Sequence, residues 1–430
     1  EIAEGKSDEE RTQFETFVLK FQQITGPVQA KGLEDTAFYR QIKLASLNEV
    51  GGDPGRFGVS PSSFHALNAQ RLSRWPGGLS TTATHDTKRG EDTRIRINVL
   101  SEFPDEWRTR LVRWSRWNAR KKVEFNEAQA PDAREEYLLY QTLIGSWPFG
   151  GPESAPPEGF TERIQEYMLK AAREAKLNTT WTDPDPTYSE ILSRFVAEVL
   201  ESPDAGPFLN DFLPFQRRIA RIGRVHSLAQ TLLKIASPGI PDVYQGCDLW
   251  DLSLVDPDNR RPVDYEHRDR LLSEMRTRLE TGTSRADLLK ELLASPESGA
   301  IKLYLIWTAL NHRKEHLTLY QQGAYRPIDA EGEHKVNLVS FARYREGRSV
   351  VAVAPRLVSG LMGEEAQTLP IGPDVWKDTR LIYPETPNIP RRWRDLFSDR
   401  VVELQDGETG PTLPISEVFA IAPFALLVDE

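Results

Sequence analysis

Apolar residues in the N-terminal part of the chain recur at helical spacing. In SDEERTQFETFVLKFQQIT, the residues Phe14, Phe17 and Phe21 are three or four positions apart, and a serine precedes the run. This spacing predicts an amphipathic helix over residues 7–25, with Ser7 as its N-cap. Residues 31–55 and 60–75 then predict a short helix that ends in a glycine-rich turn and a second, capped helix.

Strand-like runs alternate with long helical segments further along the chain. LSTTATHD follows a Pro-Gly-Gly break and is rich in β-branched residues, so a strand is predicted to end near His85 or Asp86. A helical stretch rich in Trp and Arg runs from about residue 93 to 173, and another from about 187 to 233. LLKIASPGIPDVYQG, residues 232–246, is predicted to be a buried strand.

The pattern changes toward the C-terminus. Helices are predicted at about 266–294 and 299–314, and after residue 318 the chain shows short alternating runs such as SVVAVAPRL. The order helix, strand, long helical excursion, strand indicates an α/β class, namely the C-terminal part of a (β/α)8 barrel with inserted helical subdomains, followed by an antiparallel β domain. The domains expected are 1–92, with helices and a barrel strand; 93–233, a helical insertion; 234–317, the end of the barrel; and 318–430, the β domain.

Composition narrows the classes of partner. The 430 residues include 54 Lys and Arg against 64 Asp and Glu, and the formal net charge is −10. This balance argues against nucleic acid or an anionic membrane as the main partner and favours a neutral small ligand. The single cysteine, Cys247, excludes an intrachain disulfide and favours a cytoplasmic setting. The sequence contains neither an apolar run of membrane-spanning length nor a signal-peptide core.

The His-Asp pair in STTATHDTKRGED is the first candidate for chemistry. Asp86 at the end of a barrel strand is well placed to accept hydrogen bonds from ligand hydroxyls, and His85 can donate one. The alternative is that Asp86 only caps the next turn while His85 is packed. These residues alone leave both interpretations open.

The segment HRKEH, residues 312–316, is a second candidate. It matches H-x-x-E-H, the zinc motif of inverted metallopeptidases, with Glu315 as the base. The alternative, which we favour, is a helix end whose His, Arg and Lys side chains complement the negative end of the helix dipole. We therefore expect no metal.

Residues 237–265, SPGIPDVYQGCDLWDLSLVDPDNRRPVDY, combine a strand end with aromatic and charged residues. Tyr244 and Trp250 could cover the apolar faces of sugar rings while charged groups bond to the hydroxyls. Alternatively, the charged residues of this loop simply pair with one another. Those charged residues are Asp256, Asp258, Arg260 and Arg261.

Several stretches taken together resemble maltooligosyl trehalose synthases, which are members of the α-amylase family (glycoside hydrolase family 13). The resemblance extends from about residue 28 to the end of the chain, and its motifs occur in the expected order. The stretches are VQAKGLEDTAFYR, SLNEVGGDPGRFG, TTATHDTKRGEDTR, the 237–265 segment and GAYRPI.

The resemblance implies an intramolecular transglucosylation in which a maltooligosaccharide acquires a trehalose end, with no cofactor. ATHD matches the conserved region that carries a transition-state-stabilising aspartate, here Asp86. Maltooligosyl trehalose trehalohydrolase is the implied functional partner. The substrate-binding residues implied are His85, Lys88, Arg89, Glu34, Asp35, Tyr39, Arg40, Asn48, Glu49, Tyr244, Asp256, Asp258, Arg260 and Arg261.

The sequence departs from this family in one respect. The family's nucleophilic Asp, preceded by Arg at two positions, and its acid Glu lie upstream of the THD strand, and no strand-like Arg-x-Asp run precedes His85. The chain is therefore expected to be a C-terminal portion that needs an N-terminal half and is inactive alone. A non-catalytic glucan-binding or assembly module and an α-amylase-type hydrolase are the alternatives.

Overall fold

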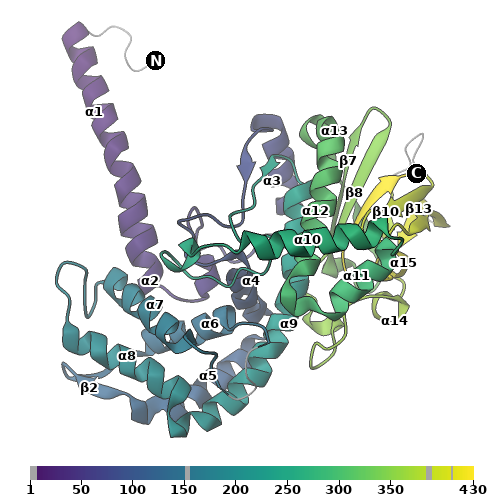
Figure 1. Cartoon of the computed structure of the whole chain (residues 1–430). Helices are drawn as coiled ribbons and strands as arrows, with labels where there is room; N and C mark the ends of the chain where they lie inside the picture. Colours follow the sequence, from purple (N-terminus) through teal and green to yellow (C-terminus); the bar gives the residue numbers. More distant parts are fainter. Residues whose placement is uncertain (1–6, 151–154, 384–389, 408–409) are drawn as a thin grey trace. The chain divides into compact units, whose positions relative to one another are not determined.

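The computed structural model describes residues 7–150, 155–383, 390–407 and 410–430, in two compact units that interleave along the sequence (Figure 1). The first unit comprises Glu1–Arg56, Leu111–Leu143 and Ala155–Leu209. The second comprises Phe57–Arg110, Ile144–Ser154 and Asn210–Glu430. The domain boundaries expected from the sequence stay a prediction.

The helices of the chain are distributed over both units (Figure 1). Their bounds are α1 Asp8–Pro27, α2 Phe38–Arg40, α3 Pro61–Arg74, α4 Glu91–Val99, α5 Pro104–Asn118, α6 Ala133–Ser146, α7 Phe160–Ala175, α8 Pro186–Glu201, α9 Gly206–Ala236, α10 Tyr265–Glu280, α11 Arg285–Ala294, α12 Ala300–Glu315, α13 Leu317–Gln322, α14 Pro373–Trp376 and α15 Ile415–Val418. A π-helical segment, Val28–Ala37, links α1 to α2.

Helix α1 confirms the helix predicted over residues 7–25. It begins with a capping box, in which the Ser7 hydroxyl accepts from the Glu10 amide at 3.3 Å and the Glu10 carboxylate accepts from the Ser7 amide at 2.9 Å. None of its residues is buried, and Phe17 and Phe21 are 63% and 58% exposed. The amphipathic pattern thus forms a helix without a fully buried residue.

The first unit also contains a hairpin that the sequence did not predict. Strands β2, Val123–Phe125, and β3, Ala128–Ala130, pair antiparallel within the stretch that was expected to be helical up to residue 173. The two turn residues, Asn126 and Glu127, have φ values of 51° and 65°. Positive φ at both central positions is the geometry of a tight hairpin turn, so the helical expectation was wrong here.

The second unit contains a parallel pair of very short strands. Strand β1, Leu79–Ser80, pairs with β4, Ile240–Pro241. The strand predicted to reach His85 therefore ends at Ser80. The Thr84 and Thr87 hydroxyls bond to nearby backbone instead, and Thr87 Oγ1 donates to the Thr84 carbonyl at 2.8 Å. Such local bonds compete with a strand ladder.

The strand predicted over residues 232–246 is also mostly absent. Its first part, LLKIA, is the last turn of α9, because Leu228, Leu232 and Ile235 continue one helical face into the core. The helix predicted over 266–294 is likewise divided into α10 and α11. Gly282 lies between them with a φ of +104°, a conformation open to glycine but strained for other residues.

The antiparallel β domain predicted after residue 318 is confirmed. One sheet has six strands in the order β11-β10-β14-β8-β7-β5, and the other has four in the order β12-β13-β9-β6. The strands are β5 Ala324–Pro327, β6 Asp329–Glu331, β7 Leu338–Arg345, β8 Arg348–Pro355, β9 Arg380–Ile382, β10 Arg392–Asp395, β11 Val401–Glu403, β12 Gln405–Gly407, β13 Gly410–Pro414 and β14 Ala425–Asp429.

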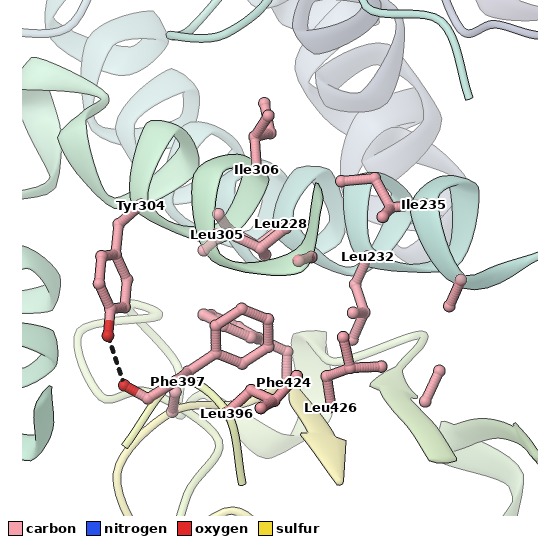
Figure 2. Packing of buried hydrophobic residues seen from close by; sticks show 14 of the residues in the cluster. Leu228, Leu232, Ile235, Tyr304, Leu305, Ile306, Leu396, Phe397, Phe424 and Leu426 are labelled. Carbon is pink, nitrogen blue, oxygen red and sulfur yellow. Dashed lines mark hydrogen bonds between the residues drawn. The ribbon is translucent and has the colours of Figure 1, made fainter. Parts of the chain in front are cut away.

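The six-stranded sheet is buried on both faces. Along β8, Val350 and Ala352 face one apolar cluster, whereas Val351 and Val353 face another that includes residues of the four-stranded sheet. This is the two-residue alternation of a strand between two layers. Figure 2 shows the first cluster, in which residues of α9 and α12 pack over the sheet and Tyr304 Oη donates to the Phe397 carbonyl at 2.7 Å.

Among the described residues, no helix is both long and apolar enough to cross a membrane.

Candidate functional site

The turn that follows β1 presents His85 and Asp86 to solvent. Their side chains are 63% and 61% exposed, and His85 Nε2 lies 3.3 Å from Asp86 Oδ2. The turn is held from below by Asn259, whose amide donates to the Thr84 and His85 carbonyls at 3.3 and 3.1 Å. The backbone of the turn is thus held by Asn259, while the Asp86 carboxylate remains open to a ligand.

The loop that follows β4 meets this turn. Arg260 places a guanidinium nitrogen 3.3 Å from Asp86 Oδ1, and its distance to Asp256 Oδ2 is 4.0 Å. Tyr244 Oη donates to the Asn259 carbonyl at 3.1 Å. The structure therefore brings together residues predicted from two segments that lie more than one hundred positions apart in the sequence.

Part of the loop pairs internally, as the alternative interpretation expected. Arg261 Nε lies 3.3 Å from Asp258 Oδ1, and Asp258 Oδ2 accepts from the Leu254 amide at 2.7 Å. These contacts shape the loop, whereas Arg260 extends toward Asp86. The ring nitrogen of Trp250 donates to the Pro296 carbonyl at 2.6 Å, which directs this indole into the fold.

Lys88 and Arg89 are buried, with exposures of 6% and 3%. Arg89 forms a β-bridge to Leu254, and the Gly90 amide donates to the Ser253 carbonyl at 2.8 Å. A Cβ at Gly90 would lie 2.5 Å from Asp251 Oδ2, so the backbone approaches this segment more closely than any side chain permits. The stretch after Asp86 is thus held against residues 251–254.

A buried cluster of charged side chains includes Glu91 and Asp92, which follow Gly90. Lys302 of α12 is fully buried, and its ammonium group lies 2.5 Å from Glu91 Oε1 and 2.8 Å from Asp92 Oδ2. Lys234 of α9 lies 3.5 Å from Glu91 Oε2 and donates to Thr82 Oγ1 at 2.8 Å. The cluster therefore ties both ends of the 82–92 segment to two core helices.

The electrostatics of this cluster favour the charged forms of Glu91 and Lys302. Burial alone would raise the pKa of Glu91, but Lys302 and Lys234 lower it to about 2. Burial likewise opposes the charge of Lys302, yet Asp92 and Glu91 raise its pKa above the ordinary value. Burial raises the pKa of Asp92, with Lys302 acting against it. Paired charges in this setting stabilise only as a complete set.

The predicted residues of the first unit make contacts within that unit. Glu34 Oε1 accepts from the Gly51 amide at 3.2 Å, and Glu49 Oε1 accepts from the Val50 amide at 2.8 Å. Arg40 Nε donates to the Ala175 carbonyl at 2.6 Å. Buried Asn48 donates to the Phe38 carbonyl at 2.7 Å. Asp35 forms an ion pair with Lys31, and Tyr39 is buried.

The two histidines of HRKEH contact each other and neighbouring side chains. Their rings lie 4.4 Å apart, His312 Nδ1 is 2.8 Å from Tyr320 Oη, and His316 Nδ1 is 3.0 Å from an Arg348 nitrogen. In the described part of the chain, no three His, Cys, Asp or Glu side chains are grouped so as to hold a metal ion. The helix-end interpretation fits these contacts.

Three supporting residues were missed by sequence reasoning. Asn259 lies inside the predicted 256–261 loop, so only its role was overlooked. Lys302 was signalled by its place in GAIKLYLIW, because a lysine in an apolar helical run must find a buried partner. Nothing in the sequence near Lys234 indicates that it contacts Glu91 or Thr82.

No family model matches this chain. Two curated proteins of Mycobacterium tuberculosis, from strains CDC 1551 / Oshkosh and ATCC 25618 / H37Rv, are 36% identical to it over 388 residues, and each is described as a putative maltooligosyl trehalose synthase. The match covers 90% of this chain and 45% of either relative. The chain thus spans about half the length of the curated relatives it matches.

Solved structures give the same result. The maltooligosyltrehalose synthase of Arthrobacter ramosus has a TM-score of 0.75 and 36% identity, over 96% of this chain and 46% of that one. Another structure described as maltooligosyl trehalose synthase has a TM-score of 0.73 and 30% identity, over 99% of this chain and 50% of that one. A Sulfolobus tokodaii protein described as a hypothetical maltooligosyl trehalose synthase has a TM-score of 0.70 and 29% identity, over 98% of this chain and 48% of that one.

Proposed function

The chain belongs to the maltooligosyl trehalose synthase family, and we propose that it supplies the C-terminal portion of a composite active site in which Asp86 stabilises the transition state. The observation that carries this proposal is the meeting of two loops. The loops after the parallel strands β1 and β4 bring Asp86 and Arg260 to within 3.3 Å. Ligand sites of α/β barrels lie at the carboxyl ends of their strands.

The barrel itself is part of this proposal. Strands β1 and β4 are parallel neighbours separated by a long helical excursion, as consecutive strands of a (β/α)8 barrel would be. Each has only two residues, which suits strands whose remaining partners come from another part of the enzyme. The nucleophile and the acid would lie on those partners.

The proposed reaction is an intramolecular transglucosylation. The α-1,4 bond at the reducing end of a maltooligosaccharide breaks, and the released glucose is rejoined through its anomeric hydroxyl as an α,α-1,1 linkage. A retaining mechanism needs a nucleophilic carboxylate and an acid/base carboxyl about 5–5.5 Å apart. Asp86 would be neither of these groups.

In this mechanism Asp86 accepts hydrogen bonds from sugar hydroxyls that strengthen as the ring flattens toward an oxocarbenium ion. His85 donates a further bond to the same sugar. Arg260, 3.3 Å from the carboxylate, helps to fix its direction. Exclusion of water and retention of the released glucose would let rejoining compete with hydrolysis.

The other predicted residues differ in their burial and in the element to which they belong. Tyr244, Asp256, Asp258 and Arg261 would shape the subsite around the sugar from the loop after β4. Lys88 and Arg89 are buried, so they would support a subsite from behind and would not contact the sugar through an exposed side chain. Glu34, Asp35, Tyr39, Arg40, Asn48 and Glu49, which belong to the first unit, stay predicted glucan-binding residues.

The partners follow from the same proposal. The remaining half of the enzyme would complete the site, and a maltooligosyl trehalose trehalohydrolase would consume the product. A cytoplasmic setting fits the single cysteine.

The proposal is tested by following reducing ends of maltopentaose. This chain alone, a polypeptide covering the unmatched half of a relative, and their mixture are compared. We expect loss of reducing ends in the mixture only. A rise in reducing ends would indicate a hydrolase, and no change in any sample, with saturable glucan binding, would indicate a non-catalytic module.

A further inference from the structure

A cavity of about 810 Å³ opens in the second unit, away from the residues assigned above. Its walls come from α10, α11, α12 and α13 and from strands β8, β10 and β14. It shares no lining residue with the Asp86 turn, the 256–261 loop or the buried cluster around Lys302. A ligand in this cavity would therefore occupy a site separate from those residues.

Four arginines from four different elements line this cavity: Arg276, Arg285, Arg348 and Arg394. Arg285 and Arg394 share one carboxylate, that of Asp399, at 3.3 and 3.0 Å. Within the described part of the chain, Arg276 and Arg348 form no ion pair, and both are exposed. Two guanidinium groups thus face the cavity without a carboxylate partner.

The acidic residues of the wall do not neutralise these two arginines. Glu315 and Asp429 line the cavity, and neither forms an ion pair with a described residue. Asp429 Oδ1 accepts instead from the Ser349 amide at 2.8 Å. Oppositely charged side chains close enough to pair would lie within about 4 Å of each other. The arginines therefore remain available to an anion.

The remaining wall offers neutral polar groups and a ring. A guanidinium can only donate, so His316 Nδ1 accepts from Arg348 at 3.0 Å and the proton of a neutral ring lies on Nε2. Burial, with His316 and the nearby arginines, lowers the pKa of His312 to about 4. Trp307 and Asn311 belong to the same face of α12. Such groups suit hydroxyls and the apolar face of a sugar.

We propose that this cavity binds a small phosphorylated sugar, with the phosphoryl group on Arg348 and Arg276 and the sugar against Trp307 and Asn311. Guanidinium groups match the oxygens of a phosphoryl group in geometry and charge. The volume exceeds what inorganic phosphate alone would fill, and it lies in the range of small-molecule sites. The proposal does not depend on the function assigned to Asp86.

The test is isothermal titration of the full chain with glucose 6-phosphate at low ionic strength. We expect saturable binding of one molecule per chain, weaker binding of inorganic phosphate, and no binding of glucose that competes with it. Absence of saturable binding up to about 10 mM glucose 6-phosphate would overturn the proposal. Equal affinity for inorganic phosphate would overturn the assignment of a sugar.

Variants locate the site. Arg348→Gln and Arg276→Gln should each weaken binding at least about tenfold, because each removes a charge-assisted contact. Arg270→Gln is the matched control, since Arg270 is an exposed arginine of α10 outside the cavity wall. Unfolding temperatures show that each variant is folded. Affinity unchanged in both cavity variants would place the ligand elsewhere and overturn the proposal.

Discussion

His312 carries less charge at mildly acidic pH than a free histidine would. Burial is the first cause, and His316, Arg394 and Arg348 add to it, so that its pKa falls from 6.5 to about 4. Between pH 4 and 6.5, roughly, His312 is protonated in the unfolded chain and neutral in the folded chain. The free energy of unfolding contributed by His312 therefore rises as the pH rises from about 4 to 6.5.

This pH dependence can be isolated by substitution. We expect the difference in unfolding free energy between the unchanged chain and His312→Gln to increase from pH 4.5 to 6.5, roughly the interval between the two pKa values, and to be flat above about pH 7. Denaturant titrations at several pH values measure it. Buried Asp395, whose pKa is raised to about 6, is common to both chains and cancels. A constant difference across this range would contradict the account.

Single residues could be predicted from sequence where a positional rule applied to them. His85, Asp86 and Arg260 follow segments that end at the carboxyl edge of strands, and the structure brings them together. The buried state of Lys88 and Arg89 could not be predicted, because it depends on the close approach of the 251–254 segment. Local sequence does not encode which distant segment covers a residue.

At the scale of elements, α12 supports the Asp86 turn through one lysine. Replacing Lys302 by Met would leave Glu91 and Asp92 buried without their main cation. We expect a loss of about 3–5 kcal/mol in the free energy of unfolding, measured by chemical denaturation. Lys314→Met on the exposed face of the same helix is the control and should change stability by less than about 0.5 kcal/mol. Equal effects of the two substitutions would show that the cluster does not stabilise the fold.

Helix α1 has a cap but no buried residue. Most of the stability of a helix in a protein comes from packing of its apolar face, so a helix without a buried residue gains little from this source. We expect amides of Asp8–Pro27 to exchange hydrogen much faster than those of α8, whose Leu192, Phe195 and Val196 are buried. Hydrogen exchange measured by mass spectrometry compares the exchange rates of the two helices. Equal protection of the two helices would contradict the expectation.

Many helices and the β domain could be predicted because their periodicity is local. The first and last residues of the short strands β1 and β4 could not be predicted. The apolar run LLKIA is compatible with a strand or a helix end, and only its continuity with Leu228 favours the helix. Beyond Ser80, where strand β1 ends, the Thr84 hydroxyl accepts from the Asp86 amide and the Thr87 hydroxyl donates to the Thr84 carbonyl. Tertiary partners decide such short elements.

At the scale of the whole molecule, the chain matches about half of each relative. A parallel pair of strands presents unpaired edges and gains stability from further strands. Under the proposed function, a second half of the enzyme would be needed for chemistry, although both loops of the Asp86 site are already formed in this chain. In the proposed enzyme, Asp86 acts on the transition state and not on folding.

The most direct measurement of this claim is the turnover of maltopentaose by the reconstituted mixture with Asp86→Asn in place of the unchanged chain. We expect turnover to fall by about 10²–10³-fold, as for loss of a group aimed at a developing charge, while the unfolding free energy changes little. Asp269→Asn, an exposed aspartate of α10, is the matched control and should leave turnover unchanged. Full turnover by Asp86→Asn, or loss of its fold, would contradict the account.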